Sequence, residues 1–147
     1  MTRFFVKLIA SIKLLFPDPL APYMTALFKT LKFPKVTTLV YNTSNKRSQA
    51  FGFNSKVTKI DFGSTLENIP DETFYYCSNL GTLILRSETM IPMLKTAANV
   101  FYNTKIAKGT GYVYVPAALI EEYKAAQYWS EIAAQFRAIE DYPDICG

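Results

Sequence analysis

The feature that most constrains this chain is a segment that occurs twice. Residues 50 to 62, AFGFNSKVTKIDF, are echoed by residues 73 to 85, TFYYCSNLGTLIL. A unit this short cannot bury its own apolar side, so successive units must stack to make a continuous core. The two copies are 23 positions apart, and they pair Phe51 with Phe74, Asn54 with Cys77, Val57 with Leu80, Ile60 with Leu83 and Phe62 with Leu85.

Each copy ends in a short alternating run that is typical of a β-strand. The runs VTKIDF and LGTLIL place Ile60, Phe62, Leu83 and Leu85 on one face. KVTTLVY fits the same template 21 positions earlier, and GYVYVP supplies Val113 and Val115 later in the chain. The sequence therefore predicts about four parallel strands, near residues 36, 57, 80 and 111, with three apolar pairs joining the first two: Val36 with Val57, Leu39 with Ile60 and Tyr41 with Phe62.

The segments between the predicted strands form the return paths. After the second strand, Leu66, Ile69 and Phe74 are expected to point inward, with turns at Pro70, Asp71 and Asn79. The third return path is longer, and we expect its residues 86–110 to include a protruding loop.

Residues 1–34 predict a helical N-terminal segment that is amphipathic and basic. Its apolar face includes Phe4, Phe5, Leu8, Ile12 and Leu15, and a second helical stretch with Leu27 and Leu31 is expected before Pro34. The segment is either a cap on the first coil or a docking helix for lipid or a larger assembly. Lys7 and Lys13 interrupt the apolar run, which favours neither a cleaved signal peptide nor a transmembrane helix.

Residues 116–147 predict a helical C-terminal cap. Glu121, Glu122 and Glu131 are expected on its solvated side. Apolar residues recur there at intervals of three or four, namely Leu119, Ile120, Tyr123, Trp129, Ile132, Phe136 and Ile139.

The pattern AF-xx-C/N-xx-L-xx-I-x-L/F in the two copies resembles the BspA-type leucine-rich repeats of bacterial surface antigens and of some phage and protist proteins. Residues 111–140 resemble the usual ending of such arrays, with a Y-V-P strand, a Y-K-A-A stretch and a tryptophan. The resemblance covers residues 35–140. It implies an α/β fold, a short leucine-rich-repeat solenoid with repeats over residues 35–115, and a role in protein binding.

The composition argues against most catalytic and metal chemistry. The chain has no histidine, which removes the commonest general base and metal ligand. Cys77 and Cys146 are the only cysteines; Cys77 is expected to be a buried free thiol, and no zinc site or cofactor is expected. An enzyme that uses Asp61, Glu67, Asp71 or Glu72 on a glycan is a hypothesis that the strand pattern does not favour.

The charge is distributed unevenly along the chain. The net charge of +4 does not indicate nucleic-acid binding, yet residues 1–35 carry six basic groups against one acidic group. Residues 116–147 carry six acidic groups against two basic ones. Because the two ends of the chain carry opposite charges, they favour self-association.

The expected binding surface is the outer face of the strands, where every second side chain is exposed. Alternatively, the tyrosines of this face pack beneath the 86–110 segment. The function hypotheses are a non-enzymatic structural or adhesive module on a virion or cell surface, an intracellular scaffold, and a peripheral membrane protein. The expected binding surface on the strands consists of Thr38, Val40, Lys59, Asp61, Thr82, Ile84, Tyr112 and Tyr114.

Overall fold

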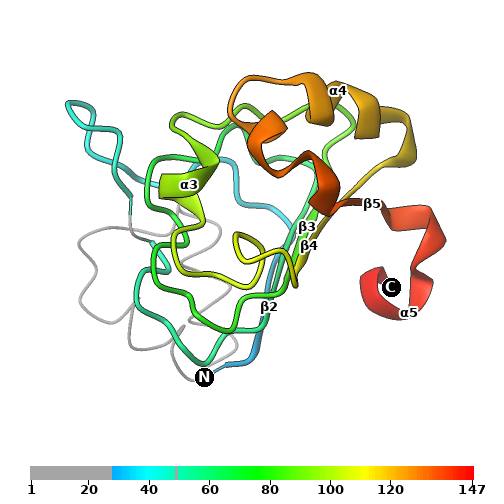
Figure 1. Cartoon of the computed structure of the whole chain (residues 1–147), viewed down its shortest axis with the longest axis horizontal. Coiled ribbons are helices and arrows are strands. Elements are labelled where there is room, and N and C mark those ends of the chain that lie inside the picture. The colour runs from blue at the N-terminus through cyan, green and yellow to red at the C-terminus, as the bar shows by residue number, and fades with distance from the viewer. Residues whose placement is uncertain (1–27, 49) are drawn as a thin grey trace.

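The computed structural model describes residues 28–48 and 50–147, and among these five short strands form one parallel sheet in chain order (Figure 1). The predictions for Phe4, Phe5, Leu8, Ile12 and Leu15 lie outside the described residues. The strands are β1 (Thr30–Phe33), β2 (Lys59–Phe62), β3 (Thr82–Leu85), β4 (Tyr112–Val115) and β5 (Phe136–Ala138). The helices are α3 (Ala97–Val100), α4 (Ile120–Ala125) and α5 (Pro143–Cys146), with 3-10 turns η1 (Ala117–Leu119), η2 (Trp129–Gln135) and η3 (Ile139–Asp141).

Each strand begins one coil of a solenoid. Thr30 pairs with Lys59, 29 positions on, and Lys59 pairs with Thr82, 23 positions on. The next steps are 30 positions to Tyr112 and, from Val113 to Phe136, again 23 positions. The predicted parallel stacking is confirmed, and longer and shorter coils alternate.

The core lies between the sheet and the return paths, and a row of aromatic rings runs through it along the solenoid axis. Ile60, Phe62, Leu83 and Leu85 are all buried, as predicted. The ring centroids are 5.6 Å apart for Phe33 and Phe51, 5.8 Å for Phe51 and Phe74, 5.3 Å for Phe74 and Phe101, and 6.1 Å for Phe101 and Trp129. Burial of each such ring contributes roughly 1.5–3 kcal/mol, so this row ties one coil to the next.

The prediction for the first strand was wrong. The strand is TLKF at residues 30–33, inside the part of the chain that was assigned to the helical N-terminal segment, and not KVTTLVY. Leu31 and Phe33 pair with Ile60 and Phe62, so the period-two pattern was present. Leu31 also continues the spacing of Leu27 and Phe28, and a short apolar run of this kind fits a helix equally well.

Val36 and Leu39 are buried although they do not belong to a strand. They lie on the first return path, where the Thr65 hydroxyl donates to the carbonyl of Val36 at 2.8 Å and the Glu67 N–H donates to the carbonyl of Thr37 at 2.9 Å. They are therefore inward-pointing residues of a return path, as Leu66 and Ile69 are one coil later.

Most of residues 86–110 follow the third coil, and the longest continuous exposed stretch of this segment is the turn at residues 107–110. Ile91, Met93, Val100, Phe101 and Ile106 of this segment are buried, because its extra residues form α3 and a tight turn within the coil. Another exposed polar turn lies in the first coil. There the side chain of Asn42 accepts hydrogen bonds from the N–H groups of Ser44 and Asn45, over an exposed stretch at residues 42–47.

The C-terminal part is helical where predicted in α4 and η2, but Phe136 belongs to a fifth strand. The cap is bonded to the third coil through Ile91. The Trp129 indole donates to the carbonyl of Ile91 at 2.7 Å, and the Tyr123 hydroxyl accepts from its N–H at 2.9 Å. The cap therefore covers the end of the core and adds one strand to the sheet.

Candidate functional site

The outer face of the sheet is the side turned away from the return paths. Alternate residues of the strands place two rows of side chains on it, each running across the sheet. One row is Thr30, Lys59, Thr82 and Tyr112, and the other is Lys32, Asp61, Ile84, Tyr114 and Arg137.

Six of the eight residues predicted for the binding surface lie on this outer face. Thr38 and Val40 do not, because the first strand lies elsewhere; both are half-buried on the first return path. The outer-face positions that were expected for Thr38 and Val40 are occupied by Thr30 and Lys32. Of the other six, Lys59, Thr82 and Tyr112 are half-buried, and Asp61, Ile84 and Tyr114 are at most 5% exposed.

The outer face over β3 and β4 is covered by residues 139–147, which we call the C-terminal segment. After β5 the chain turns back, so that η3 and α5 lie on the side of the sheet opposite the return paths (Figure 1). The rings of Tyr114 and Tyr142 meet edge to face at 5.4 Å. This second apolar cluster consists of Ile84, Tyr114 and Cys146, with Tyr112, Ile139, Tyr142 and Ile145 packed around them. The expectation that the tyrosines pack beneath residues 86–110 is therefore wrong, because that segment belongs to the return path.

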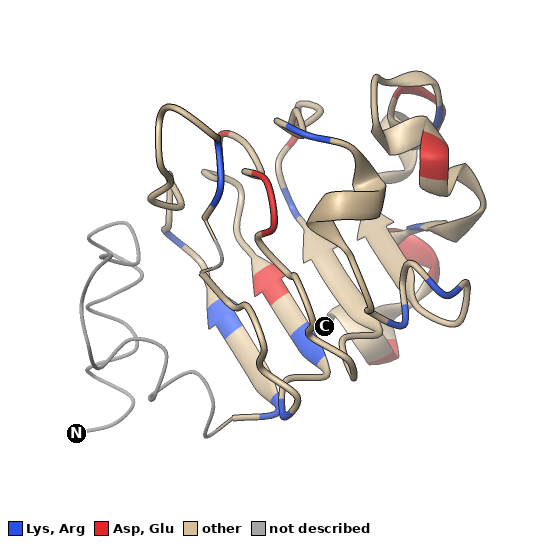
Figure 2. Cartoon of the chain, turned by 60° about the vertical axis from the view of Figure 1, so that its left-hand side comes forward, with Lys and Arg blue, Asp and Glu red and all other residues tan. Residues whose placement is uncertain are grey.

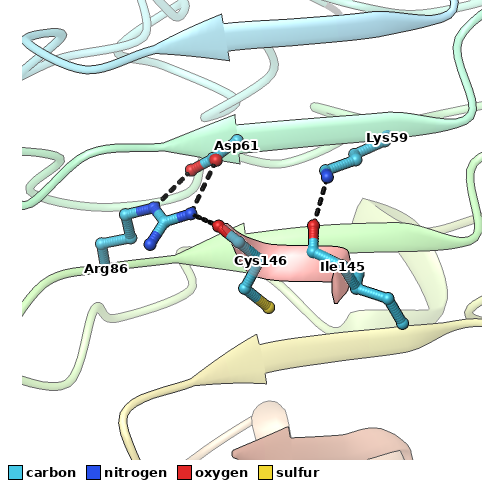
Figure 3. A network of polar contacts seen from close by, with 5 residues as sticks. All are labelled: Lys59, Asp61, Arg86, Ile145 and Cys146. Carbon is cyan, nitrogen blue, oxygen red and sulfur yellow. Dashed lines mark hydrogen bonds and ion pairs between the residues drawn. The ribbon is translucent and has the colours of Figure 1, made fainter. Parts of the chain in front are cut away.

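Polar contacts from β2 and from the residue after β3 hold the end of α5 (Figure 3). Arg86 binds the carboxylate of Asp61 through two hydrogen bonds, at 2.9 and 3.0 Å, and also donates to the carbonyl of Cys146. The Lys59 ammonium donates to the carbonyl of Ile145. Carbonyls at a helix C-terminus lack partners within the helix and carry partial negative charge, so two cations are well placed there.

These surroundings change the acidity of several groups on the outer face. The hydrogen bond to Asp61 raises the pKa of Arg86, and burial raises the pKa of Tyr114. Burial also raises the pKa of the Cys146 thiol, although the charges of Arg86 and Lys59 act in the opposite direction. The thiol is therefore neutral and unreactive while the segment is docked.

The charges of the described residues are unevenly distributed, although β2 and the return paths also carry acidic residues (Figure 2). Acidic positions gather on α4 and on the part of the chain after β5, whereas β1 and the start of β2 carry lysines. Lys32 and Lys59 lie on the outer face, and Lys59 contacts the C-terminal segment, which contains Glu140, Asp141 and Asp144.

A second surface feature is an exposed aromatic ridge formed by Phe53, Tyr75, Tyr76 and Tyr102 on the return paths. Phe53 stacks on Tyr76 at 5.2 Å and Tyr75 on Tyr102 at 5.1 Å. The side chain of Phe53 is 64% exposed. Phe53 and Tyr76 have φ values of 61° and 59°, a left-handed conformation that is unusual for aromatic residues. Aromatic residues at the same offset in successive repeats were the sequence signal for this ridge.

The carboxylates considered for an enzyme do not converge. Asp61 is paired with Arg86 on the outer face, whereas Asp71 and Glu72 lie on the return path, where Glu72 binds Arg47 at 2.6 Å. Burial raises the pKa of Asp71, with the adjacent charge of Glu72 as a second cause. Within residues 28–48 and 50–147, no group of three or more His, Cys, Asp or Glu side chains could hold a metal ion. In the same residues, no helix has the length and apolar character needed to cross a bilayer.

The sequence analysis missed the residues that cover and close the outer face. Arg86 directly follows the third strand, and Tyr142, Ile145 and Cys146 follow the expected cap. The only local signal was an apolar pattern after Phe136 interrupted by Pro143, which does not indicate where the segment docks.

Together, the stacked parallel strands, the alternating return paths and the aromatic row define a leucine-rich-repeat solenoid. The family comparison agrees: a sequence model of the BspA type leucine rich repeat region matches residues 7–114 in 6 copies. The chain belongs to this family, whose repeats are in general non-enzymatic modules for protein–protein interaction. The match begins before residue 35, where the resemblance described above began, and it includes β1. No curated protein and no solved structure matches this chain.

Proposed function

We propose that this chain is a non-enzymatic protein-binding module whose partner docks on the outer face of the sheet. One observation carries the proposal: the outer face already holds a peptide segment of the chain in the way a binding site holds a ligand. It buries the apolar side chains of the C-terminal segment against Ile84 and Tyr114, and it meets the carbonyls of that segment with Lys59 and Arg86. Solenoids commonly bind their partners on such extended surfaces.

The location that we propose is the surface of a virion or cell, and the module would act there in structure or adhesion. The resemblance to bacterial surface antigens supports this part of the proposal. Self-association would follow from the basic and acidic ends of the chain. Its test is the mass in solution at low and high salt, and a monomer at every salt concentration would exclude it.

The test of partner binding is capture from the native source with the immobilised full chain, followed by mass spectrometry. Lys32→Glu reverses an exposed charge on the outer face, and Lys108→Glu reverses an exposed charge on the third return path. We expect Lys32→Glu to lose the chains that the wild type and Lys108→Glu both retain. Capsid, tail or envelope proteins among these chains would support the proposed location. Equal capture by all three proteins would show that the outer face is not the binding surface.

A further inference from the structure

The C-terminal segment is a short chain end that docks on the outer face. Its only α-helix, α5, has four residues, and the segment follows the last strand of the sheet. Chain ends and short helices open at a lower free energy than the strands of a core. The segment can therefore leave the outer face while the sheet stays folded.

The two cations under α5 contact neutral oxygens of the segment. Lys59 and Arg86 donate to main-chain carbonyls of Ile145 and Cys146 (Figure 3). A carboxylate is a stronger acceptor for such donors than a carbonyl, because its negative charge attracts the cation in addition to the hydrogen bond. Arg86 already has the carboxylate of Asp61, whereas the ion pairs among the described residues do not include Lys59. A ligand with a carboxylate above Lys59 would gain an interaction that the segment lacks.

The surroundings of this position favour an acidic ligand with an apolar anchor. Lys32 is exposed on β1, one strand away from Lys59, and it lies directly beside Asp61 in the sheet. The aromatic and aliphatic part of the outer face over β3 and β4 accepts Tyr142 and Ile145. The occupant itself has this chemistry, since Glu140, Asp141 and Asp144 surround those two anchors in the sequence.

We infer, on the basis of the function proposed above, that the partner presents an acidic peptide segment with an aromatic or aliphatic anchor and displaces residues 139–147 from β2–β4. The anchor packs on Ile84 and Tyr114, and the acidic groups face Lys59 and Lys32. The C-terminal segment is an intramolecular competitor that lowers the apparent affinity for the partner by occupying its site.

The two free cysteines allow displacement to be measured on the full chain. Cys146 belongs to the docked segment and is 2% exposed, and Cys77 is buried in the core beside the carbonyl of Phe51. Labelling of Cys146 by a thiol reagent reports release of the segment, and labelling of Cys77 reports global unfolding. The probe is a synthetic peptide of residues 139–147 that carries Ser in place of the cysteine. We expect it to accelerate labelling of Cys146 up to a plateau and to leave Cys77 unchanged.

A charge-reversed peptide is the matched control. With Glu140→Lys, Asp141→Lys and Asp144→Lys it keeps the anchors Tyr142 and Ile145 but not the acidic groups, and we expect no acceleration. If the natural-sequence peptide binds while Cys146 stays protected, or if both peptides act equally, the inference is wrong. The proposed protein-binding function would still stand, because the capture experiment with Lys32→Glu decides it independently.

Variants of the full chain separate the contribution of the segment from that of the sheet. Tyr142→Ala removes an anchor of the segment, so we expect it to bind the peptide several-fold more tightly than the wild type by fluorescence anisotropy. In that background, Lys59→Gln should weaken binding roughly tenfold, because a hydrogen bond to a charged group is lost. Lys108→Gln should not change it. No binding to a folded Tyr142→Ala chain would overturn the inference, and if that variant does not fold, the labelling of the wild type decides.

Discussion

Phe51 and Phe74 stack on each other with an angle of 11° between their rings, although they are 23 positions apart in the sequence. Both side chains are at most 1% exposed, and each contacts the next ring of the row on its other side. The spatial period of the fold and the sequence period therefore coincide at this pair, and the stability of the solenoid should depend on it.

We expect Phe74→Ala to lower the free energy of unfolding by about 3–5 kcal/mol, because it leaves a cavity inside the aromatic row. Phe74→Leu should cost less, since it fills most of the volume. Tyr76→Ala is the control, because Tyr76 is an exposed neighbour of the same loop. Urea denaturation followed by Trp129 fluorescence measures all three. Equal losses for Phe74→Ala and Tyr76→Ala would contradict the stacked core.

The placement of the first strand can be tested at Gly63. A Cβ atom on Gly63 would lie 2.1 Å from the carbonyl oxygen of Pro34, because residues after β1 and β2 approach closely there. We expect Gly63→Ala to destabilise the protein by about 1–3 kcal/mol or more, as overpacking against backbone cannot relax easily. At Gly81 the nearest atom is a side-chain carbon of Lys105 at 3.5 Å, so Gly81→Ala should be tolerated. Calorimetric melting of both variants is the measurement, and a tolerated Gly63→Ala would place β1 elsewhere.

The contact between the cap and the third coil predicts that the Tyr123 hydroxyl group stabilises the fold. Tyr123→Phe leaves the buried N–H of Ile91 without its acceptor, which should cost roughly 1–3 kcal/mol. Tyr128→Phe is the control, because the Tyr128 hydroxyl makes no hydrogen bond to the described residues. Chemical denaturation should separate the two variants clearly, and equal stability would show that the cap is not bonded to Ile91 through this group.

Alkaline pH should weaken the fold through two buried acids. Burial raises the pKa of Cys77 from 9.0 to about 12 and the pKa of Tyr123 from 10.0 to about 12. Between these values the unfolded chain has lost protons that the folded chain retains, so stability is full below about pH 9 and falls as the pH rises toward 12.

The control for this prediction is Cys77→Ala in the presence of reductant. The variant should be less stable at neutral pH, because it loses buried volume, but its stability should fall less steeply at alkaline pH. Urea midpoints at about pH 8 and about pH 11 for both proteins give the comparison. If the stability of both proteins falls equally between these pH values, the pKa of the Cys77 thiol is not raised in the folded chain.

The strands β2, β3 and β4 could be predicted because their signal is local. Ile60, Leu83 and Val113 each belong to a run with period two, and such a run keeps one side of a strand in the core regardless of the rest of the chain. The first strand could not be assigned in this way. Two pairs of residues in this region are equally buried, namely Leu31 with Phe33 and Val36 with Leu39. Local spacing therefore does not distinguish the strand from the return path.

The outer face was only partly predictable. The alternation that buries Ile60 also determines that Lys59 and Asp61 lie on the opposite side. What covers that side depends on contacts between residues 60 and 86 positions apart, namely Arg86 with Cys146 and Lys59 with Ile145. No periodic signal links them, because they are not equivalent positions of a repeat.

The amino-acid order alone thus specified the stacking of short coils, the parallel sheet and most of its inward and outward residues. The reason is that the spacing of neighbouring apolar side chains determines which face of a strand is buried. Folding in three dimensions decided where the first coil begins and what rests on the outer face. Both depend on which distant backbone can approach closely, at Gly63 and Pro34 and at the end of α5 above Lys59 and Arg86.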